Sequence, residues 1–472
     1  MINLKDSNAR AVFHFFCEIS KIPRGSGNTG AIADYLTQFA KAKGLEFYRD
    51  GFDNVIIKKP GTVGYEKKPA IILQGHTDMV LQKADGVTWD MEKNGVKPIL
   101  DGDFIKAEGT TLGADDGIAV AYALALLDSS DISHPPIEAV FTSNEEIGLI
   151  GAEALDCSRL SGKMMINLDS DKEGVFIAGC AGGRRIDISL PISYEQADEN
   201  KYTLIIDGLL GGHSGVMINK GRTNAIKRLC EYLSSFGNIK LISISGGVAD
   251  NAIPPSAAAE FVSHLSLNEL SEIAGRLKKS LDETSEKENI TLALAGKANR
   301  VMTAKSSENL ISLINDIPYG VIKMSEEIPD MTETSINLGI ISTDGLRVNI
   351  TTALRSSKDN EKERLAARVK EIGARYSADI NEHGDYPGWE YKKDSHLRDI
   401  MCEIYRNMYN KDASVVTIHA GLECGLFSKK IEGLDCISMG PLAYDIHTPD
   451  EKLSVSSTER VWEYLKEVLK NI

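Results

Sequence analysis

The sequence lacks several features that mark specialised classes of protein. Its 7 cysteines are scattered and include no CxxC pair, which argues against a disulfide framework and against a cysteine zinc site. Lys and Arg total 53 against 68 Asp and Glu, and this net charge of -15 disfavours binding to nucleic acid or to anionic lipid. Even the apolar run AVAYALALL is too short to span a membrane. The first residues, MINLKDSNARAVFHFF, do not resemble a secretory signal, so we expect a cytoplasmic protein.

The length of the chain and its pattern of strands and helices predict two domains. At 472 residues it exceeds what one ordinary hydrophobic core accommodates, and its 42% apolar content is typical of a globular protein. Residues 1–185 alternate strand and helix patterns. In residues 186–387, strands alternate with strongly charged amphipathic helices, a pattern typical of an α+β domain, and residues 388–472 return to the first pattern. We therefore expect an α/β fold: a discontinuous domain with a mainly parallel sheet covered by helices, into which an α+β domain is inserted.

Three short apolar runs in the first region end in residues that can carry chemistry. They predict buried strands at 68–75, 137–142 and 164–168, with a helix at 117–127 between the first two. The strands are followed by His76-Thr77-Asp78, by Asn144-Glu145-Glu146 and by Asp169. Ligands bind outside the carboxyl ends of the strands in open α/β sheets, so these residues are expected to meet at one edge.

The remaining elements are predicted from periodicity. In the middle region we expect strands at 186–190, 203–206, 241–245 and 347–352, and amphipathic helices at 219–236, 268–286 and 359–378. In the last region we expect strands at 414–418 and 436–439 and a closing helix at 456–471. This last region follows the pattern of the first, so it is expected to complete the first sheet.

Five residues of the predicted discontinuous domain are candidate metal ligands. They are imidazole and carboxylate groups, the donors that zinc favours: His76, Asp115, Glu146, Asp169 and His447. Five ligands are too many for one open zinc site, but they suffice for two ions if one carboxylate bridges. Paired acids are usually solvated surface residues, yet these follow apolar strands, where an unpaired carboxylate would be costly to bury.

Two further acids neighbour the candidate ligands. Asp78 lies two residues after His76 and is placed to accept the second imidazole N–H, which would fix the tautomer. Glu145 immediately precedes Glu146, and one of two such carboxylates can bind metal while the other takes a proton from water. The residues alone do not decide which of the two is the base.

The motifs resemble those of one known family. GHTDMV, LGADDGIAVA, TSNEEIGLIGA, INLDSD and IHTPDE occur in the order and approximate spacing of the M20 metallopeptidases. The chain is similar to the aminoacyl-histidine dipeptidase subgroup, also called Xaa-His or cytosol non-specific dipeptidases. The similarity extends over nearly all residues, through GGHSG (211–215), NAIP (251–254) and HAGLECG (419–425).

The resemblance implies a metal centre with two Zn²⁺ per subunit, for which Co²⁺ or Mn²⁺ could substitute. It implies that His76, Asp115 and Asp169 bind one ion, and that Asp115, Glu146 and His447 bind the other. Asp115 would then bridge the two ions.

The resemblance also implies a mechanism of peptide-bond hydrolysis. Glu145 is expected to act as general base on a zinc-bridging water, whose hydroxide attacks the peptide carbonyl, and then to return the proton to the leaving amine. Asp78 is expected to support His76, and His213 of GGHSG to stabilise the oxyanion from a lid formed by the inserted domain. The peptide bond between Asp115 and Asp116 is expected to be cis.

Four residues are implied in binding the substrate. Asn251 and Arg355 resemble lid residues, and the guanidinium fork of an arginine suits the C-terminal carboxylate of a dipeptide. In HAGLECG, Gly421 would let the backbone approach the substrate and Glu423 would meet its free amino group.

Other functions stay open. On the same scaffold, the chain could be an aminotripeptidase or an N-acyl amino acid deacylase, and a deacylase needs no free amino group. A binding protein that kept the fold without the activity is a further alternative, although the five ligands and Glu145 are all present. The expected partner is a dipeptide substrate, with no nucleic acid and no membrane, and the lid could mediate a homodimer.

Overall fold

The computed structural model describes residue 4 and residues 6–278 and 287–472, which divide into two units by their contacts. Unit 1 comprises Met1–Cys180, Trp389–Ile418 and Leu422–Ile472. Unit 2 comprises Ala181–Gly388 together with His419–Gly421. The inserted unit therefore begins a few residues before position 186 and takes three residues from the last region of the chain.

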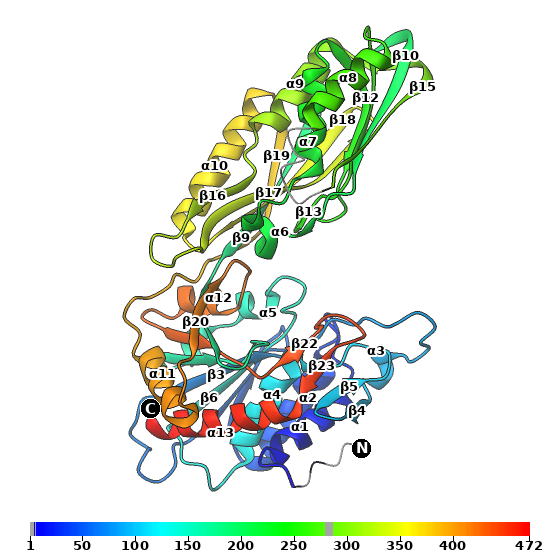
Figure 1. Ribbon diagram of the computed structural model, residues 1–472. Helices are drawn as coiled ribbons and strands as arrows, with labels where there is room; N and C mark the ends of the chain where they lie inside the picture. The colour runs from blue at the N-terminus through cyan, green and yellow to red at the C-terminus, as the bar shows by residue number, and fades with distance from the viewer. Residues whose placement is uncertain (1–3, 5, 279–286) are drawn as a thin grey trace. The chain divides into compact units, whose positions relative to one another are not determined.

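Unit 1 is built from alternating strands and helices (Figure 1). Its helices are α1 (Arg10–Ser20), α2 (Gly30–Lys43), α3 (Met91–Asn94), α4 (Ala114–Asp128), α5 (Ile150–Ala154), α11 (His396–Tyr409), α12 (Cys424–Lys430) and α13 (Val455–Asn471). Its strands are β1 (Glu46–Arg49), β2 (Val55–Lys59), β3 (Ile71–His76), β4 (Pro98–Asp101), β5 (Phe104–Ala107), β6 (Ile137–Thr142), β7 (Met164–Asn167), β8 (Val175–Cys180), β20 (Ser414–Ile418), β21 (Asp435–Ser438), β22 (Ala443–Tyr444) and β23 (Lys452–Ser454).

The main sheet of unit 1 has a parallel centre. Its strand order is β1-β2-β6-β3-β7-β21-β8-β20. The consecutive pairs from β6 to β21 are parallel, as is β8 with β20, whereas β1 with β2 and β2 with β6 are antiparallel. The three predicted strands correspond to β3, β6 and β7, and β21 from the last region joins them. The prediction of a mainly parallel sheet completed by both ends of the chain is confirmed.

A smaller sheet brings two distant loops together. Its order is β22-β23-β5-β4, and the central pair is antiparallel, with Lys452 opposite Lys106. The loop between β22 and β23 carries His447, and the segment after β5 leads to Asp115. The pairing of β23 with β5 therefore places these two loops side by side.

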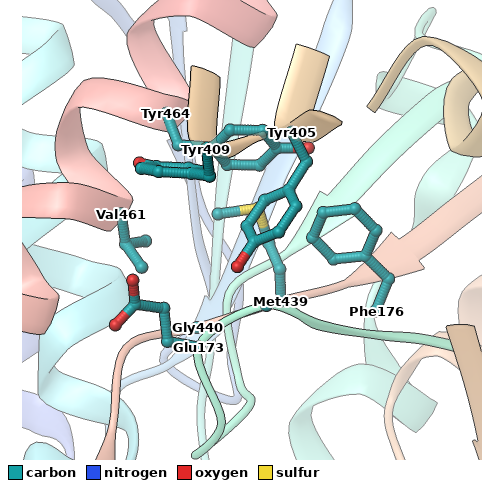
Figure 2. Close-up of a pocket in the computed structure, with 9 residues that line it drawn as sticks. Glu173, Phe176, Tyr405, Tyr409, Met439, Gly440, Val461 and Tyr464 are labelled. Atoms are coloured by element: carbon teal, nitrogen blue, oxygen red, sulfur yellow. The ribbon is translucent and has the colours of Figure 1, made fainter. Parts of the chain in front are cut away.

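Aromatic residues fill the region between β8, α11 and α13 (Figure 2). The ring of Phe176 stacks on Tyr464 and meets Tyr405 edge to face, both at 5.7 Å between ring centroids. They border a cavity of about 10 Å³, which holds no more than a water molecule. We therefore interpret this pocket as part of the core.

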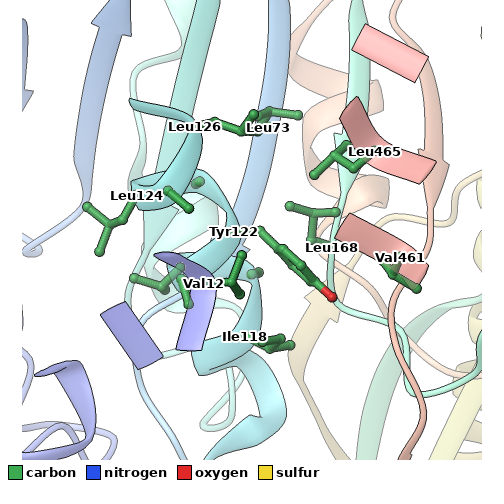
Figure 3. Packing of buried hydrophobic residues seen from close by; sticks show 14 of the residues in the cluster. Val12, Leu73, Ile118, Tyr122, Leu124, Leu126, Leu168, Val461 and Leu465 are labelled. Atoms are coloured by element: carbon green, nitrogen blue, oxygen red, sulfur yellow. The ribbon is translucent and has the colours of Figure 1, made fainter. Parts of the chain in front are cut away.

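Helix α4 lies at the centre of the hydrophobic core of unit 1. Its sequence from Gly117 is rich in Ala, Leu and Ile, and its residues are buried on every side, as expected for a helix enclosed by other elements. Figure 3 shows Tyr122 and Leu126 of α4 among Val12 of α1, Leu73 of β3 and Leu465 of α13. Apolar as α4 is, no helix in the described ranges is long and apolar enough to cross a membrane.

Unit 2 consists of an antiparallel sheet with helices packed against it (Figure 1). Its strands are β9 (Gly182–Pro191), β10 (Tyr194–Asp207), β11 (Gly212–His213), β12 (Ile239–Gly246), β13 (Ala252–Ile253), β14 (Ala257–Ser263), β15 (Asn289–Met302), β16 (Gly320–Met324), β17 (Thr332–Asp344), β18 (Arg347–Ser356) and β19 (Asp379–Tyr386). Its helices are α6 (Ser214–Met217), α7 (Ala225–Ser235), α8 (Leu267–Lys278), α9 (Ala304–Asp316) and α10 (Asp359–Arg375). The main strand order is β15-β10-β14-β12-β17-β18-β9-β19, with β16 paired to β17, and β11 pairs separately with β13.

Some predicted bounds in unit 2 are wrong. The helix predicted at 219–236 begins only at Ala225, because Gly221 has a positive φ of 69° and the Asn224 side chain caps the helix by accepting from the amides of Ile226 and Lys227. The last eight residues of the helix predicted at 268–286 lie outside the described residues. Strands β15 and β17 were not predicted, because much of their sequence is polar or small.

We expect Leu124→Ala to lower the free energy of unfolding by about 2–5 kcal/mol, because Leu124 is fully buried in α4 and its truncation leaves a cavity. The measurement is urea denaturation followed by circular dichroism. Leu100→Ala is the control, since Leu100 is 43% exposed. An equal effect of the two substitutions would contradict the assignment of α4 to the core.

Candidate metal centre

Three neighbouring strands of unit 1 deliver candidate ligands to one edge of the sheet. His76 is the last residue of β3, which pairs in parallel with β6 on one side and with β7 on the other. Glu145 and Glu146 follow β6, and Asp169 follows β7. The carboxyl ends of these strands thus bring together residues that lie far apart in the sequence, as predicted.

Asp115 lies between the two histidines. Its Oδ1 is 3.0 Å from Nε2 of His76, and its Oδ2 is 3.0 Å from Nε2 of His447. His447 Nε2 is also 2.9 Å from Oε1 of Glu146. One carboxylate therefore faces a different imidazole with each of its oxygens, the arrangement that a bridging ligand requires.

Within the described part of the chain, three sets of side chains have ligand atoms close enough to hold a cation. They are His76, Asp116 and Asp169; His76, Glu145 and Glu146; and Asp115, Glu146 and His447. The last set is the one predicted for the second ion. The first set contains Asp116 in place of the predicted Asp115. Oδ1 of Asp115 nevertheless also lies 3.0 Å from Nε2 of His76.

Asp116 is a site residue that the sequence reasoning did not assign. Its Oδ2 accepts from the backbone amide of His76 at 3.1 Å, so the carboxylate supports the end of β3. Gly75 leaves the room for it, because a Cβ at Gly75 would lie 2.6 Å from the same oxygen. The bond between Asp115 and Asp116 is cis, as predicted.

Asp78 connects two of the strand ends. Its Oδ1 lies 3.4 Å from Nδ1 of His76 and accepts from the Glu145 amide at 3.0 Å. Its Oδ2 accepts from the Ser26 hydroxyl at 2.7 Å and from the Glu146 amide at 3.3 Å. Burial raises the pKa of Asp78, but these hydrogen bonds outweigh it and lower the pKa to about 2. Asp78 therefore stays ionised while it orients both His76 and the turn that carries Glu145 and Glu146.

The cluster carries more negative charge than its imidazoles offset. Burial raises the pKa of Asp115, but hydrogen bonds from His447 and His76 outweigh it, and the pKa lies below the usual range. For Asp169, burial and then the neighbouring carboxylates raise the pKa well above its ordinary value. Burial likewise dominates the raised pKa of Glu145, and nearby carboxylates add to it. Such shifts arise where like charges are held together in a poorly solvated place.

These residues fit a pair of divalent cations. The donors are imidazole nitrogens and carboxylate oxygens, which suit zinc and its neighbours in the transition series. The excess of buried negative charge would be relieved by cations, and Asp115 has an oxygen for each of two sites. We therefore assign this edge of unit 1 as the candidate metal centre.

The predicted lid residues gather in unit 2. His213 pairs with Ala252 across β11 and β13, next to Asn251, whose carbonyl accepts from the Ser214 amide at 2.8 Å. Burial, and then the positive charge of Arg355 on β18, lower the pKa of His213.

Arg355 has neighbours that the sequence reasoning missed. Its Nη1 donates to the Tyr386 hydroxyl at 3.1 Å, and Ser335 is its cross-strand partner on β17. The Ser335 hydroxyl is 2.7 Å from Nε2 of His419, and burial, followed by the charge of Arg355, lowers the pKa of His419 to about 3. His419 is therefore neutral. Gly421 lies against the Tyr386 ring, where a Cβ would come within 2.7 Å of the ring.

Glu423 is buried between two strands that lead to the candidate metal centre. It belongs to unit 1 and is fully buried. Its Oε2 accepts from the side-chain amide of Gln74 at 2.5 Å and from the Thr142 hydroxyl at 2.7 Å. Burial raises its pKa to about 7. The carboxylate thus ties β3 to β6 through Oε2, whereas its Oε1 has no hydrogen-bond partner among the described residues. Its predicted contact with a substrate amino group stays a prediction.

A wider cleft in unit 2 has a volume of about 500 Å³. Its cations already bind groups of unit 2: Arg222 donates to the Gly211 carbonyl at 2.8 Å, and Arg228 donates to Glu288 at 2.9 Å. Lys227 donates to carbonyl groups at the end of α9. We therefore assign no ligand to this cleft.

Comparison with known proteins identifies one family. The model of peptidase family M20/M25/M40 matches residues 72–471. The chain is 36% identical to the cytosol non-specific dipeptidase of Escherichia coli (strain K12), over 100% of this chain and 99% of that protein.

Solved structures give the same result. The aminoacylhistidine dipeptidase from Vibrio alginolyticus has a TM-score of 0.92 and 33% identity, and the alignment covers 100% of this chain and 98% of that one. The aminopeptidase PepT from Bacillus cereus, with a TM-score of 0.59, 17% identity and 98% of both chains covered, shares the fold. Because the family model covers most of the chain and the Escherichia coli relative aligns with all of it, the chain belongs to peptidase family M20 and is a metallopeptidase.

Proposed function

We propose that the protein is a two-metal dipeptidase that hydrolyses the peptide bond of unblocked dipeptides, including Xaa-His. The observation that carries the proposal is the Asp115 carboxylate, which faces His76 with one oxygen and His447 with the other, at 3.0 Å each. The substrate class is supported by the full-length relatives, which are named as a non-specific dipeptidase and an aminoacylhistidine dipeptidase. The former is named a cytosol enzyme, and we propose the cytoplasm for this protein too.

The metal ligands of the proposal are His76, Asp115, Glu146, Asp169 and His447, and the proposed ions are two Zn²⁺, with Co²⁺ or Mn²⁺ as substitutes. When bound, such ions would polarise the peptide carbonyl and lower the pKa of water. Asp78 holds the His76 ring through Nδ1 and so directs Nε2 towards Asp115.

Glu145 is the proposed general base. Its amide is held by Asp78 at 3.0 Å, and its side chain shares a set of nearby ligand atoms with His76 and Glu146. From there the carboxylate takes the proton of the attacking water and delivers it to the nitrogen of the leaving amine. The roles of His213, Asn251, Arg355, Gly421 and Glu423 on the substrate stay predictions, as does a homodimer through unit 2.

A substrate panel tests the function. We expect zinc-loaded protein to cleave Ala-His and Leu-Gly, and to leave Ala-Ala-Ala and N-acetyl-Leu intact, because a dipeptidase requires a free amino group and a single peptide bond. Cleavage is measured by chromatography of the products. Cleavage of only the tripeptide would indicate an aminotripeptidase, and cleavage of only N-acetyl-Leu would indicate a deacylase.

Removal of the ions should abolish this activity and lower the thermal midpoint of unfolding, since the carboxylates of the metal centre would then repel one another. The measurement is activity and differential scanning calorimetry after dialysis against a chelator, with reloading by Zn²⁺ as the control. A protein that keeps full activity with less than a tenth of an equivalent of metal would refute the metal centre.

We expect Glu145→Gln to lower kcat by about 10²–10⁴-fold, because the amide cannot take a proton from water. KM and the zinc content should change little. The control is Glu153→Gln, an exposed glutamate on the following helix, which should leave kcat unchanged. If Glu145→Gln kept kcat within threefold of the wild type, another group would be the base.

A further inference from the structure

Two buried charged residues outside the proposed ligand set converge on the loop that precedes α4. Glu451 and Arg24 are each only 2% exposed, although a charged side chain is rarely buried without partners. They come from opposite ends of the chain, one from the loop after His447 and the other from the segment after α1. Both contact the backbone of residues 112–115, which ends in Asp115.

Glu451 accepts hydrogen bonds from four consecutive backbone amides. Its Oε2 accepts from Leu112 at 2.7 Å and from Gly113 at 3.0 Å, and its Oε1 accepts from Ala114 at 2.8 Å and from Asp115 at 3.3 Å. The first amides of a helix have no partner within the helix, and a negative charge there is favoured by the helix dipole. The carboxylate therefore fixes the course of the backbone up to Asp115 itself.

Arg24 ties the same loop to the end of β3. Its Nη1 donates to the carbonyls of Thr77 at 3.0 Å and Asp78 at 3.3 Å, and its Nη2 donates to the carbonyl of Gly113 at 2.5 Å. The loop fits the guanidinium closely, because a Cβ on Gly113 would lie 2.5 Å from Nη2. One planar cation thus connects the segment after His76 with the segment before Asp115.

The contacts of Glu451 also restrain the second histidine, His447. Glu451 directly precedes β23 and lies four residues after His447 in the same loop, and its amide donates to the Thr448 carbonyl at 3.2 Å. Holding Glu451 on the amides of residues 112–115 therefore limits how far His447 can move from Asp115. The two 3.0 Å contacts of the Asp115 carboxylate depend on both anchors.

We propose that Glu451 and Arg24 are positioning residues that hold the Asp115 carboxylate between His76 and His447, so that loss of either weakens binding of the cations. The inference rests on the proposed metal centre. It concerns the affinity of the site rather than the chemical step, since neither residue is among its proposed ligands. Groups that orient metal ligands typically change metal affinity by about 10–100-fold when removed.

A residue of the same kind elsewhere in unit 1 provides a matched control. Glu138 on β6 is 3% exposed and accepts from the amides of Ser161 and Gly162, at 2.9 Å and 3.0 Å through Oε2. It lies four residues before the end of the strand, about 13 Å from the metal edge. Glu138→Gln should therefore lower stability without lowering metal affinity.

The experiment measures Zn²⁺ affinity of the full-length protein by competition with a chelating dye, together with the thermal midpoint of the metal-free form. We expect Glu451→Gln to bind Zn²⁺ about 10–100-fold more weakly than the wild type, and Glu138→Gln to bind it as the wild type does. The visible spectrum of the Co²⁺-loaded protein should change for Glu451→Gln only, because its ligand geometry is altered.

Arg24→Lys provides a second variant, should Glu451→Gln fail to fold by circular dichroism. Lysine keeps the charge, but a single ammonium cannot span the three carbonyls, so Zn²⁺ affinity should again fall. Wild-type affinity in the folded variants, or an equal loss in Glu138→Gln, would overturn this inference while leaving the metal centre in place. A wild-type protein that binds no Zn²⁺ would overturn the metal centre and this inference together.

Discussion

The repulsion among carboxylates at one edge of the parallel sheet is the constraint on which unit 1 depends. Asp115, Asp116, Glu145, Glu146 and Asp169 lie near the imidazoles of His76 and His447, and burial, together with the neighbouring carboxylates, raises the pKa values of Asp169 and Glu145. Charge of one sign can be held at such density only where backbone dipoles, a buried cation, bound metal or protonation compensates it. Metal binding and folding of this edge are therefore linked, because cations that bind the folded form stabilise it.

The fold meets this constraint with elements that carry no reactive group. Parallel strands β6, β3 and β7 set the spacing of the ligands, and the pairing of β23 with β5 adds His447 from the far end of the chain. Asp78 links the end of β3 to the Glu145-Glu146 turn, since it contacts groups of both. His76, Asp115 and Glu146 are thus held through the backbone as well as the side chain, which reduces the cost of organising the site when metal binds.

Short apolar strands with ionisable residues after them made much of unit 1 predictable from sequence. The run that ends in His76 and the run at 137–142 have the short length and apolar composition typical of buried strands, and strand order then follows from few choices. Unit 2 was less predictable, because the second half of β15 is rich in small and polar residues, as loops are. The burial of Arg24 and Glu451 could not be predicted for another reason. A single charged residue has no local pattern, and only tertiary contacts reveal its burial.

Strand β21 lies between β7 and β8 in the sheet. In the sequence, residues 181–434 separate it from the end of β8. During synthesis, residues 1–180 leave the ribosome before the strand that lies between β7 and β8 in their sheet. Until residues 435–438 emerge, the flanks of β7 and β8 expose unpaired backbone groups, which are prone to wrong pairing. The sheet of unit 1 can therefore close only after residues 435–438 have been made, so a chain that stopped before them would keep an open sheet.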